Sequence, residues 1–274
     1  MVRKQVFGLI LVQFLGGQAR AAFEHASEGA GLPGLGGSSA AWAGSWWTLP
    51  SNPSLLAFLP GPAVSFAHIP RPFEMRELGI SSCALAVPTS WGSFGLAATR
   101  AGFDLYRETT GSLSWACAAQ EILAFGLSVR VHHLAIRGYG SRSVPGLDAG
   151  VIARLAGGVR WGLVAFNLNA PELGSDPLPR VLKTGLAYSP WSGSHAAVEL
   201  SKDISHALEV RLELQYQILE VLRLRGEICS APDQMGGGAG LSLGWVVLDY
   251  CLMQHPDLGP THGFALSLLL HAMP

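Results

Sequence analysis

A strict alternation of apolar and polar side chains is the feature that most constrains this chain. In residues 208–216 it runs without exception, with the apolar set Leu208, Val210, Leu212, Leu214 and Tyr216 and the polar set Glu209, Arg211, Glu213 and Gln215. A period of two places the two sets on opposite faces of a β-strand, whereas a helix would scatter the charges around its axis. The segment is therefore predicted to be a strand with one apolar and one charged face.

The same period recurs along most of the chain and predicts fourteen strands. They are expected at residues 62–69, 79–87, 92–101, 111–119, 123–134, 147–155, 158–166, 180–188, 194–202, 206–216, 221–229, 238–243, 246–253 and 262–271. An even number of strands is typical of bacterial barrels, and a tilted strand of about 9–11 residues spans a bilayer.

The connections between these segments alternate in length. Long polar or Gly/Pro-rich links are expected at 70–77, 102–110, 135–146, 167–179, 230–237 and 254–261, and short turns at 88–91, 120–122, 156–157, 189–193, 217–220 and 244–245. The link 203–205 is the exception, because it is short although it falls on the side of the long loops. The glycines Gly157, Gly158, Gly236, Gly237 and Gly238 are interpreted as turn residues. Long loops on one rim and tight turns on the other indicate an outer-membrane β-barrel. A soluble β-sandwich is the alternative, because it shows the same alternation.

Composition favours the barrel over the sandwich. The 274 residues are 49% hydrophobic and only 14% charged, with a mean hydropathy of +0.32, whereas ordinary soluble domains carry about 25% charge. So few charges can barely cover a water-facing surface, which suggests that part of the surface faces lipid. The balance of 18 Lys+Arg against 19 Asp+Glu also excludes the basic surplus of a nucleic-acid-binding protein.

The N-terminus resembles an export signal. Arg3 and Lys4 precede an apolar run at 6–15, and Ala19 and Ala21 supply small residues where a signal peptidase cleaves. Residues 1–21 are therefore predicted to be a Sec signal peptide, and the mature chain is expected in the bacterial outer membrane. No later stretch reaches the roughly 18 apolar residues of a transmembrane helix, which excludes a helical membrane protein.

Between the signal and the first strand, residues 22–61 lack the period of two. They are rich in Gly, Ala and Ser and contain Trp42, Trp46 and Trp47. We expect a plug or lid that enters the lumen from the periplasmic end, ahead of a barrel formed by residues 62–274. A disordered leader is the alternative, against which the three tryptophans argue.

A set of charged residues alternates with the apolar residues of the outer face, so their side chains are predicted to point into the lumen. The candidate site residues are Arg130, His132, Glu209, Arg211, Glu213, Arg223, Arg225, Glu227 and Asp249, and Arg154, Arg160, Lys183 and Glu199 share their face. These side chains form either a selective polar pore for a ligand or a plug of mutually neutralising ion pairs. Because both signs are interspersed along neighbouring strands, the sequence favours the plug.

No catalytic, metal or cofactor site is predicted. There is no G-x-S-x-G elbow, and among nine histidines and many serines chance proximity is expected. His255, Asp257 and His262 could ligate a metal, but Pro256 and Gly259 favour an ordinary turn. Cys83, Cys117, Cys229 and Cys251 form no metal or disulfide pattern; they are interpreted as small apolar fillers, and their disulfide state stays open.

Short motifs in a consistent order resemble one family of barrels. Residues 36–43 (GGSSAAWA) followed by Asn52, Pro53 and residues 54–57 (SLLA) resemble the N-terminal signature of FadL-like outer-membrane barrels, and the PorV/PorQ branch in particular. Further matches are residues 103–108, 167–169, 248–250 and 255–262, so the landmarks extend through most of the mature chain. Ser54 departs from the usual alanine, and the last strand lacks a terminal aromatic residue.

The resemblance implies two functions. The PorV/PorQ likeness implies a membrane anchor associated with type IX-like protein secretion, with outer-membrane lipid and a secretion-system or cargo protein as partners. On that interpretation the loop residues Asp104, Tyr106, Arg107, His255 and His262 are contact candidates. The wider FadL-like likeness implies instead a channel for small hydrophobic molecules such as fatty acids. An apolar cavity beneath the leader would favour transport, and a lumen closed by charges would favour anchoring.

Overall fold

A computed structural model describes residues 22–23, 38–43, 51–231 and 233–270. The predicted signal peptide at 1–21 lies outside the described residues, as do Trp46 and Trp47 of the predicted plug. The export signal therefore remains a prediction.

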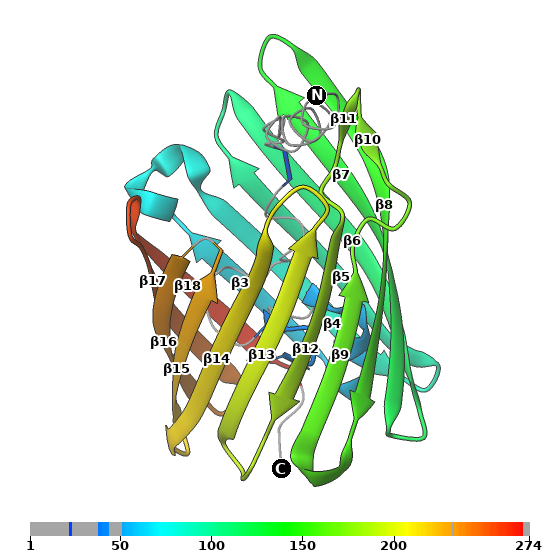
Figure 1. The fold of residues 1–274 in the computed structure, drawn as a ribbon, viewed down its shortest axis with the longest axis vertical. Coiled ribbons are helices and arrows are strands. Elements are labelled where there is room, and N and C mark those ends of the chain that lie inside the picture. The colour runs from blue at the N-terminus through cyan, green and yellow to red at the C-terminus, as the bar shows by residue number, and fades with distance from the viewer. Residues whose placement is uncertain (1–21, 24–37, 44–50, 232, 271–274) are drawn as a thin grey trace, which may run out of the picture.

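Fourteen antiparallel strands close into a single barrel (Figure 1). In chain order they are β3 (Ala63–Ile69), β4 (Ile80–Thr89), β5 (Gly92–Gly102), β6 (Tyr106–Ala119), β7 (Leu123–Ile136), β8 (Gly140–Arg154), β9 (Val159–Ala165), β12 (Val181–Tyr188), β13 (Ser194–Asp203), β14 (Leu208–Leu219), β15 (Leu222–Ser230), β16 (Asp233–Leu243), β17 (Val246–His255) and β18 (Gly259–Leu269). Each strand pairs with its chain neighbours, and β18 closes the ring against β3, with Phe264 opposite His68 and Leu269 opposite Ala63. Every predicted strand overlaps an observed one, so the predicted antiparallel barrel of about fourteen strands is confirmed.

The two faces of the wall differ as the alternation predicts. Along β7, Leu127 and Val129 are more than half exposed on the outside, while Ser128 and Arg130, which alternate with them, are buried toward the lumen. Large apolar side chains are exposed in this way on strands all around the barrel. Such a wall suits hydrocarbon outside and a polar interior. Among the described residues no helix is long and apolar enough to cross a membrane.

Several predicted long loops are wrong, because the strands continue through them. Residues 106–110, 140–146, 233–237 and 259–261 belong to β6, β8, β16 and β18, which leaves short turns at 103–105, 137–139 and 256–258. Gly236, Gly237 and Gly238 likewise lie inside β16 and are not turn residues. Glycine and polar residues indicate a turn locally, but here a paired neighbouring strand satisfies the backbone hydrogen bonds.

Two longer connections remain on the rim where the long loops were predicted. The β3–β4 link contains the 3-10 helices η4 (Pro72–Glu74) and η5 (Arg76–Leu78), and the β9–β12 link contains the hairpin β10 (Glu172–Leu173) and β11 (Asp176–Pro177). Figure 1 shows the hairpin near the upper rim beside the long strands β7 and β8, whereas the opposite rim has only short turns. The turn η6 (Ala156–Gly158) contains Gly157 and Gly158 as predicted, both with positive φ.

Candidate functional site

Part of the N-terminal region lies inside the barrel. Asn52 begins the 3-10 helix η3 (Pro53–Phe58): its Oδ1 accepts hydrogen bonds from Ser54 N at 3.0 Å and Ser54 Oγ at 2.7 Å. Proline is favoured in the first helical turn, where it lacks only an unneeded donor. The predicted Asn52–Pro53 turn is thus the cap of this helix. Leu55 and Leu56 pack in an apolar cluster with Ala86, Ala116 and Ile152 of the wall.

A short hairpin precedes η3 and lies against the inner face of the neighbouring strands β12 and β13. Its strands β1 (Ser38–Ser39) and β2 (Trp42–Ala43) flank Ala40 and Ala41. Asn52 Nδ2 donates to Ala40 O at 2.6 Å, and Ala40 N donates to Glu199 Oε2 at 2.6 Å. Glu199 also pairs with Lys183 at 3.7 Å. We call the described residues 38–43 and 51–59 the internal segment; hydrogen bonds join its two parts to each other and to β13.

Glycines on the inner wall make room for the internal segment. A Cβ at Gly126 would overlap Pro53 and Ser54, one at Gly150 would overlap the Asn52 side chain, and one at Gly162 would overlap Ala40 and Ala41. At Gly95 it would lie 2.9 Å from a methyl of Leu56. These glycines on β5, β7, β8 and β9 allow the segment to approach the backbone of the wall closely. The sequence analysis did not identify these glycines, although their positions on the predicted inner face could have indicated them.

Most of the predicted lumen charges gather on β14, β15 and β17. Arg211 Nη2 lies 2.8 Å from Glu209 Oε1, and Arg211 Nε lies 3.4 Å from Glu227 Oε1. Arg225 Nη2 lies 2.8 Å from Asp249 Oδ1, and Arg225 Nε donates to Gln215 Oε1 at 3.0 Å. The ion cluster comprises Glu209, Arg211, Glu213, Arg225, Glu227 and Asp249, of which all but the less enclosed Glu209 are buried. Its ion pairs run along β14, from β14 to β15 and from β15 to β17, and its four carboxylates outnumber its two guanidinium groups.

Arg130 and His132 lie away from the ion cluster, on β7. Arg130 Nε donates to Asp148 Oδ2, and Asp148 Oδ1 accepts from Asn167 N at 3.0 Å. Asn167 Oδ1 in turn lies 3.1 Å from His132 Nε2. Phe23, which the sequence reasoning also missed, is buried with its ring centroid 5.1 Å from that of His132. Arg130 and His132 therefore form a local network apart from the other predicted charges. Arg223 lies on β15 two residues before Arg225, and among the described residues its buried Nε has no hydrogen-bond partner.

The predicted loop contacts lie at the rim, with one exception. Asp104 is exposed and lies 3.7 Å from Arg107, and Tyr106 donates to Glu108 at 2.6 Å. His255 ends β17, where its Nδ1 accepts from Asp257 N at 3.1 Å and Leu258 N at 3.2 Å, so it orders a turn. His262 is not in a loop. It lies within β18, exposed on the outer face, because β18 already begins at Gly259, inside the predicted loop. Its Nδ1 lies 2.9 Å from the Tyr250 hydroxyl.

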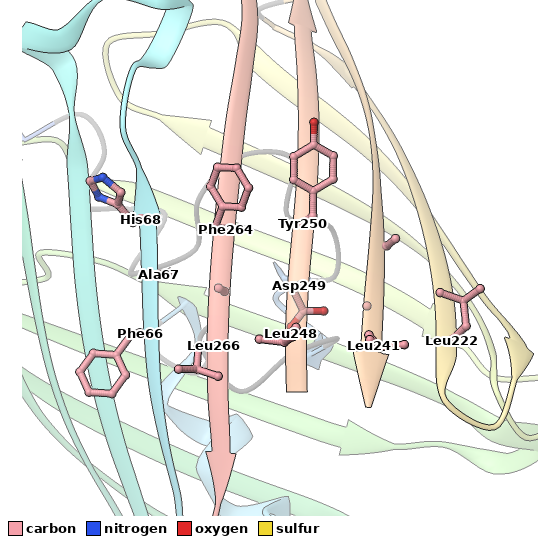
Figure 2. Close-up of a pocket in the computed structure, with 13 residues that line it drawn as sticks. Phe66, Ala67, His68, Leu222, Leu241, Leu248, Asp249, Tyr250, Phe264 and Leu266 are labelled. Atoms are coloured by element: carbon pink, nitrogen blue, oxygen red, sulfur yellow. The ribbon is translucent and has the colours of Figure 1, made fainter. Parts of the chain in front are cut away.

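A hollow of about 570 Å³ lies on the outer wall over β3 and β15–β18. Figure 2 shows Phe66, Leu266, Leu248, Leu241 and Leu222 in one row across these strands, with His68, Phe264 and Tyr250 in a second row. Register pairs the members of each row directly, as in Leu248 with Leu266 and Leu266 with Phe66. The hollow belongs to the apolar outer surface and not to the lumen.

The described residues contain no cluster of three or more metal-ligating side chains. Cys83, Cys117, Cys229 and Cys251 are free thiols; Cys251 is buried as a filler, whereas Cys83 is exposed on the wall. Cys229 Sγ donates to Glu209 Oε1 at 3.2 Å, so it contributes to the polar interior.

Comparison with known proteins identifies the fold. Neither a known family description nor a curated protein matches the sequence. Among solved structures, the CymD monoaromatic hydrocarbon channel aligns with a TM-score of 0.66 at 13% identity, over 88% of this chain and 99% of that chain. A Pseudomonas aeruginosa FadL homologue aligns at 0.61 with 11% identity over 86% and 96%. The Pseudomonas putida toluene transporter TodX aligns at 0.57 with 10% identity over 84% and 93%. The chain therefore has the barrel fold of FadL-like proteins.

Proposed function

We propose that this protein is a channel of the bacterial outer membrane that admits small hydrophobic molecules. The observation that carries the proposal is a packed apolar contact inside a closed barrel, where Leu55 and Leu56 of the internal segment meet Ala86, Ala116 and Ile152. When these groups separate, a hydrophobic solute can pass between them without contact with buried charge. The fold shared with hydrocarbon channels supports this function over the secretion role.

In this proposal the internal segment acts as the gate of the channel. Its helix η3 lies against β5–β8 and its hairpin against β12 and β13, and hydrogen bonds of Asn52 and Glu199 help to hold it. A solute passes when the apolar contacts of η3 with the wall separate. The ion cluster on β14, β15 and β17 keeps the opposite wall fixed, because its paired charges resist separation.

The test is permeation of the full mature chain in liposomes. We expect toluene to equilibrate across these vesicles faster than across vesicles without protein, while glucose is retained. Equal toluene rates with and without protein would contradict the proposal. A variant with Leu55→Asp and Leu56→Asp, which makes the inner apolar surface charged, should lose the toluene effect while still forming a heat-modifiable barrel.

The location and domain division are part of the same proposal. Residues 1–21 direct export, residues 22–61 supply the internal segment, and residues 62–274 form the barrel. N-terminal sequencing of protein extracted from isolated outer membranes should begin at Ala22. Release of the protein from those membranes without detergent would refute membrane insertion.

A secretion anchor is the second candidate function. It is favoured by the PorV/PorQ-like motifs and by the ion cluster, whose paired charges fill part of the lumen. The rim residues Asp104, which is exposed, and Arg107, which is half-buried, would then contact a secretion or cargo protein. Affinity purification in mild detergent decides between the candidates, because an anchor retains a partner protein that Asp104→Ala with Arg107→Ala releases.

A further inference from the structure

The hollow on the outer wall has a polar end and an apolar end. Its two rows lie at different heights on the strands, with His68, Phe264 and Tyr250 in one and Phe66 and Leu266 in the other (Figure 2). Strands β3 and β17 run from the short turns toward the rim that carries η4, η5 and the β10–β11 hairpin, which we call the long-loop rim. The row with His68 and Tyr250 is therefore the one nearer the long-loop rim.

Hydrogen-bonding groups occupy this upper row. His68 Nδ1 lies 3.1 Å from Ile80 O and 2.9 Å from Ser81 Oγ. Because a carbonyl oxygen only accepts, the contact with Ile80 requires the ring proton on Nδ1 and leaves Nε2 as an acceptor for a further partner. The Tyr250 hydroxyl lies 2.9 Å from His262 Nδ1. The hollow is thus amphipathic, with apolar side chains toward the middle of the wall and polar groups toward the rim.

The upper row leads to an arginine on the outer face. In the register Phe264 lies opposite His68, His68 opposite Ser81 and Ser81 opposite Arg100. Arg100 is exposed two residues before the end of β5, on the same face as Leu96, which is 57% exposed. Since neighbouring strands lie about 4.8 Å apart, the backbone of Arg100 is about 10 Å from that of His68.

A second arginine stands beside Arg100. Arg107 of β6 pairs with Gly102, two residues after Arg100, so the two arginines are diagonal neighbours on the outer face. Within the part of the chain that the structure describes, no carboxylate forms an ion pair with Arg100, and the buried Nε of Arg107 has no hydrogen-bond partner. The exposed Asp104 lies 3.7 Å from Arg107, which is a weak pairing. This part of the outer face therefore carries a positive charge that the protein leaves largely unbalanced.

We propose that the hollow and the pair Arg100 and Arg107 bind one molecule of lipopolysaccharide, the phosphorylated glycolipid of the outer leaflet. The long loops of outer-membrane barrels face the cell exterior, so the polar end of the hollow lies in the outer leaflet. Guanidinium groups bind phosphate through bidentate hydrogen bonds. The acyl chains then fill the apolar hollow, and His68 Nε2 accepts a hydrogen bond from a sugar hydroxyl.

The width of the hollow favours a lipid with several acyl chains. The hollow extends over five adjacent strands, β15–β18 and β3, which is about 19 Å of wall. The two chains of a glycerophospholipid cover only part of this width, whereas lipid A, the membrane portion of lipopolysaccharide, carries several chains below one phosphorylated head. The inference goes beyond the channel function, because it rests on the outer-membrane location and requires no transport.

The test is native mass spectrometry of the full mature chain, freed of lipid in detergent and titrated with bisphosphorylated lipid A. We expect a one-to-one complex. Dephosphorylated lipid A and phosphatidylglycerol should each bind about tenfold or more weakly, and inorganic phosphate should not displace lipid A. Equal binding of phosphatidylglycerol would contradict the choice of glycolipid, and displacement by inorganic phosphate would show a site for a free anion instead.

Substitutions of the arginines locate the head of the lipid. The double variant Arg100→Gln with Arg107→Gln should bind lipid A about tenfold more weakly. Lys202→Gln is the matched control, because Lys202 is also exposed on the outer face near the long-loop rim but lies on β13, away from the hollow. Unchanged affinity in the double variant would overturn the proposal. If the double variant does not fold, Arg100→Gln alone carries the same expectation.

A substitution in the hollow locates the acyl chains. Ala239 of β16 lies in the register between Leu224 and Tyr250 and lines the hollow, so Ala239→Leu should fill it and weaken lipid A binding several-fold. Ala149→Leu, on the outer face of β8, is the control and should leave binding unchanged. Heat-modifiable gel mobility shows whether each variant is a folded barrel. Full affinity in folded Ala239→Leu would place the lipid outside the hollow and contradict the proposal.

Failure of this inference is distinct from failure of the channel function. Liposomes that pass toluene, with a protein that does not distinguish lipid A from phosphatidylglycerol, would refute the lipid site alone. Lipid A binding that depends on Arg100 and Arg107, in a protein that passes no toluene, would refute the channel and leave the lipid site in place.

Discussion

The side-chain amide of Asn52 donates a 2.6 Å hydrogen bond to the carbonyl oxygen of Ala40, twelve residues earlier in the chain. This bond links η3 to the hairpin, and the hairpin is bound to Glu199 on β13 through Ala40 N. One buried side chain thus connects the two parts of the internal segment, which lie against neighbouring arcs of the wall. The attachment is local enough to be tested by single substitutions.

Asn52→Ala should loosen the internal segment without opening the barrel. The substitution removes the cap of η3 and leaves Ala40 O and Ser54 N without their partner, a loss of about 1–2 kcal/mol in the local stability of the segment. Hydrogen exchange measured by mass spectrometry should show faster exchange in residues 52–59 and unchanged exchange in the barrel strands. Asn169→Ala, which removes two hydrogen bonds at an exposed loop, is the control and should not affect residues 52–59.

Gly126→Ala should displace η3 from the wall. A methyl group at this position overlaps the backbone of Pro53 and Ser54, and a rigid strand cannot move away from it. We expect liposomes with this variant to release a small trapped solute several times faster than wild type. Gly226→Ala is a matched control, because a Cβ there meets nothing within 4 Å. Equal leakage of the two variants would show that the segment does not obstruct the lumen.

The strands could be predicted from sequence, but the contacts across the lumen could not. The alternation in residues such as Leu212 and Glu213 depends only on which face meets lipid, so a period of two places every strand. The strand ends were missed because pairing, not composition, decides whether Gly237 lies in a turn. Ala40 and Glu199 are 159 positions apart, and no local pattern indicates that they bond. The alternation along each strand identified which charged side chains point into the lumen. It could not show that Arg130 and Arg225 lie in separate networks, because that depends on how the strands pair around the barrel.

Arg225→Met should destabilise the barrel strongly. It removes the partner of Asp249 at 2.8 Å and leaves that carboxylate buried, which costs about 3–5 kcal/mol in the free energy of unfolding. Guanidinium unfolding in lipid vesicles, followed by tryptophan fluorescence, measures the loss. In the double variant Arg225→Met with Asp249→Leu the loss should be smaller than in the single variant, because the buried carboxylate is removed together with its cation. A double variant less stable than the single one would show that the pair acts through other contacts.

Leu127→Arg tests whether the outer face of β7 meets hydrocarbon. Leu127 is 57% exposed in the middle of the strand, between Phe125 and Val129, which are also exposed. In water such an exchange is nearly neutral, but near the midplane of a bilayer an arginine costs about 2–4 kcal/mol. We therefore expect a lower midpoint for unfolding from vesicles and little change in detergent micelles, which adapt to the charge. Tyr139→Arg, at the 90% exposed tip of the β7–β8 turn, should be neutral in both media. A neutral Leu127→Arg in vesicles would place this face in water and would favour a soluble barrel.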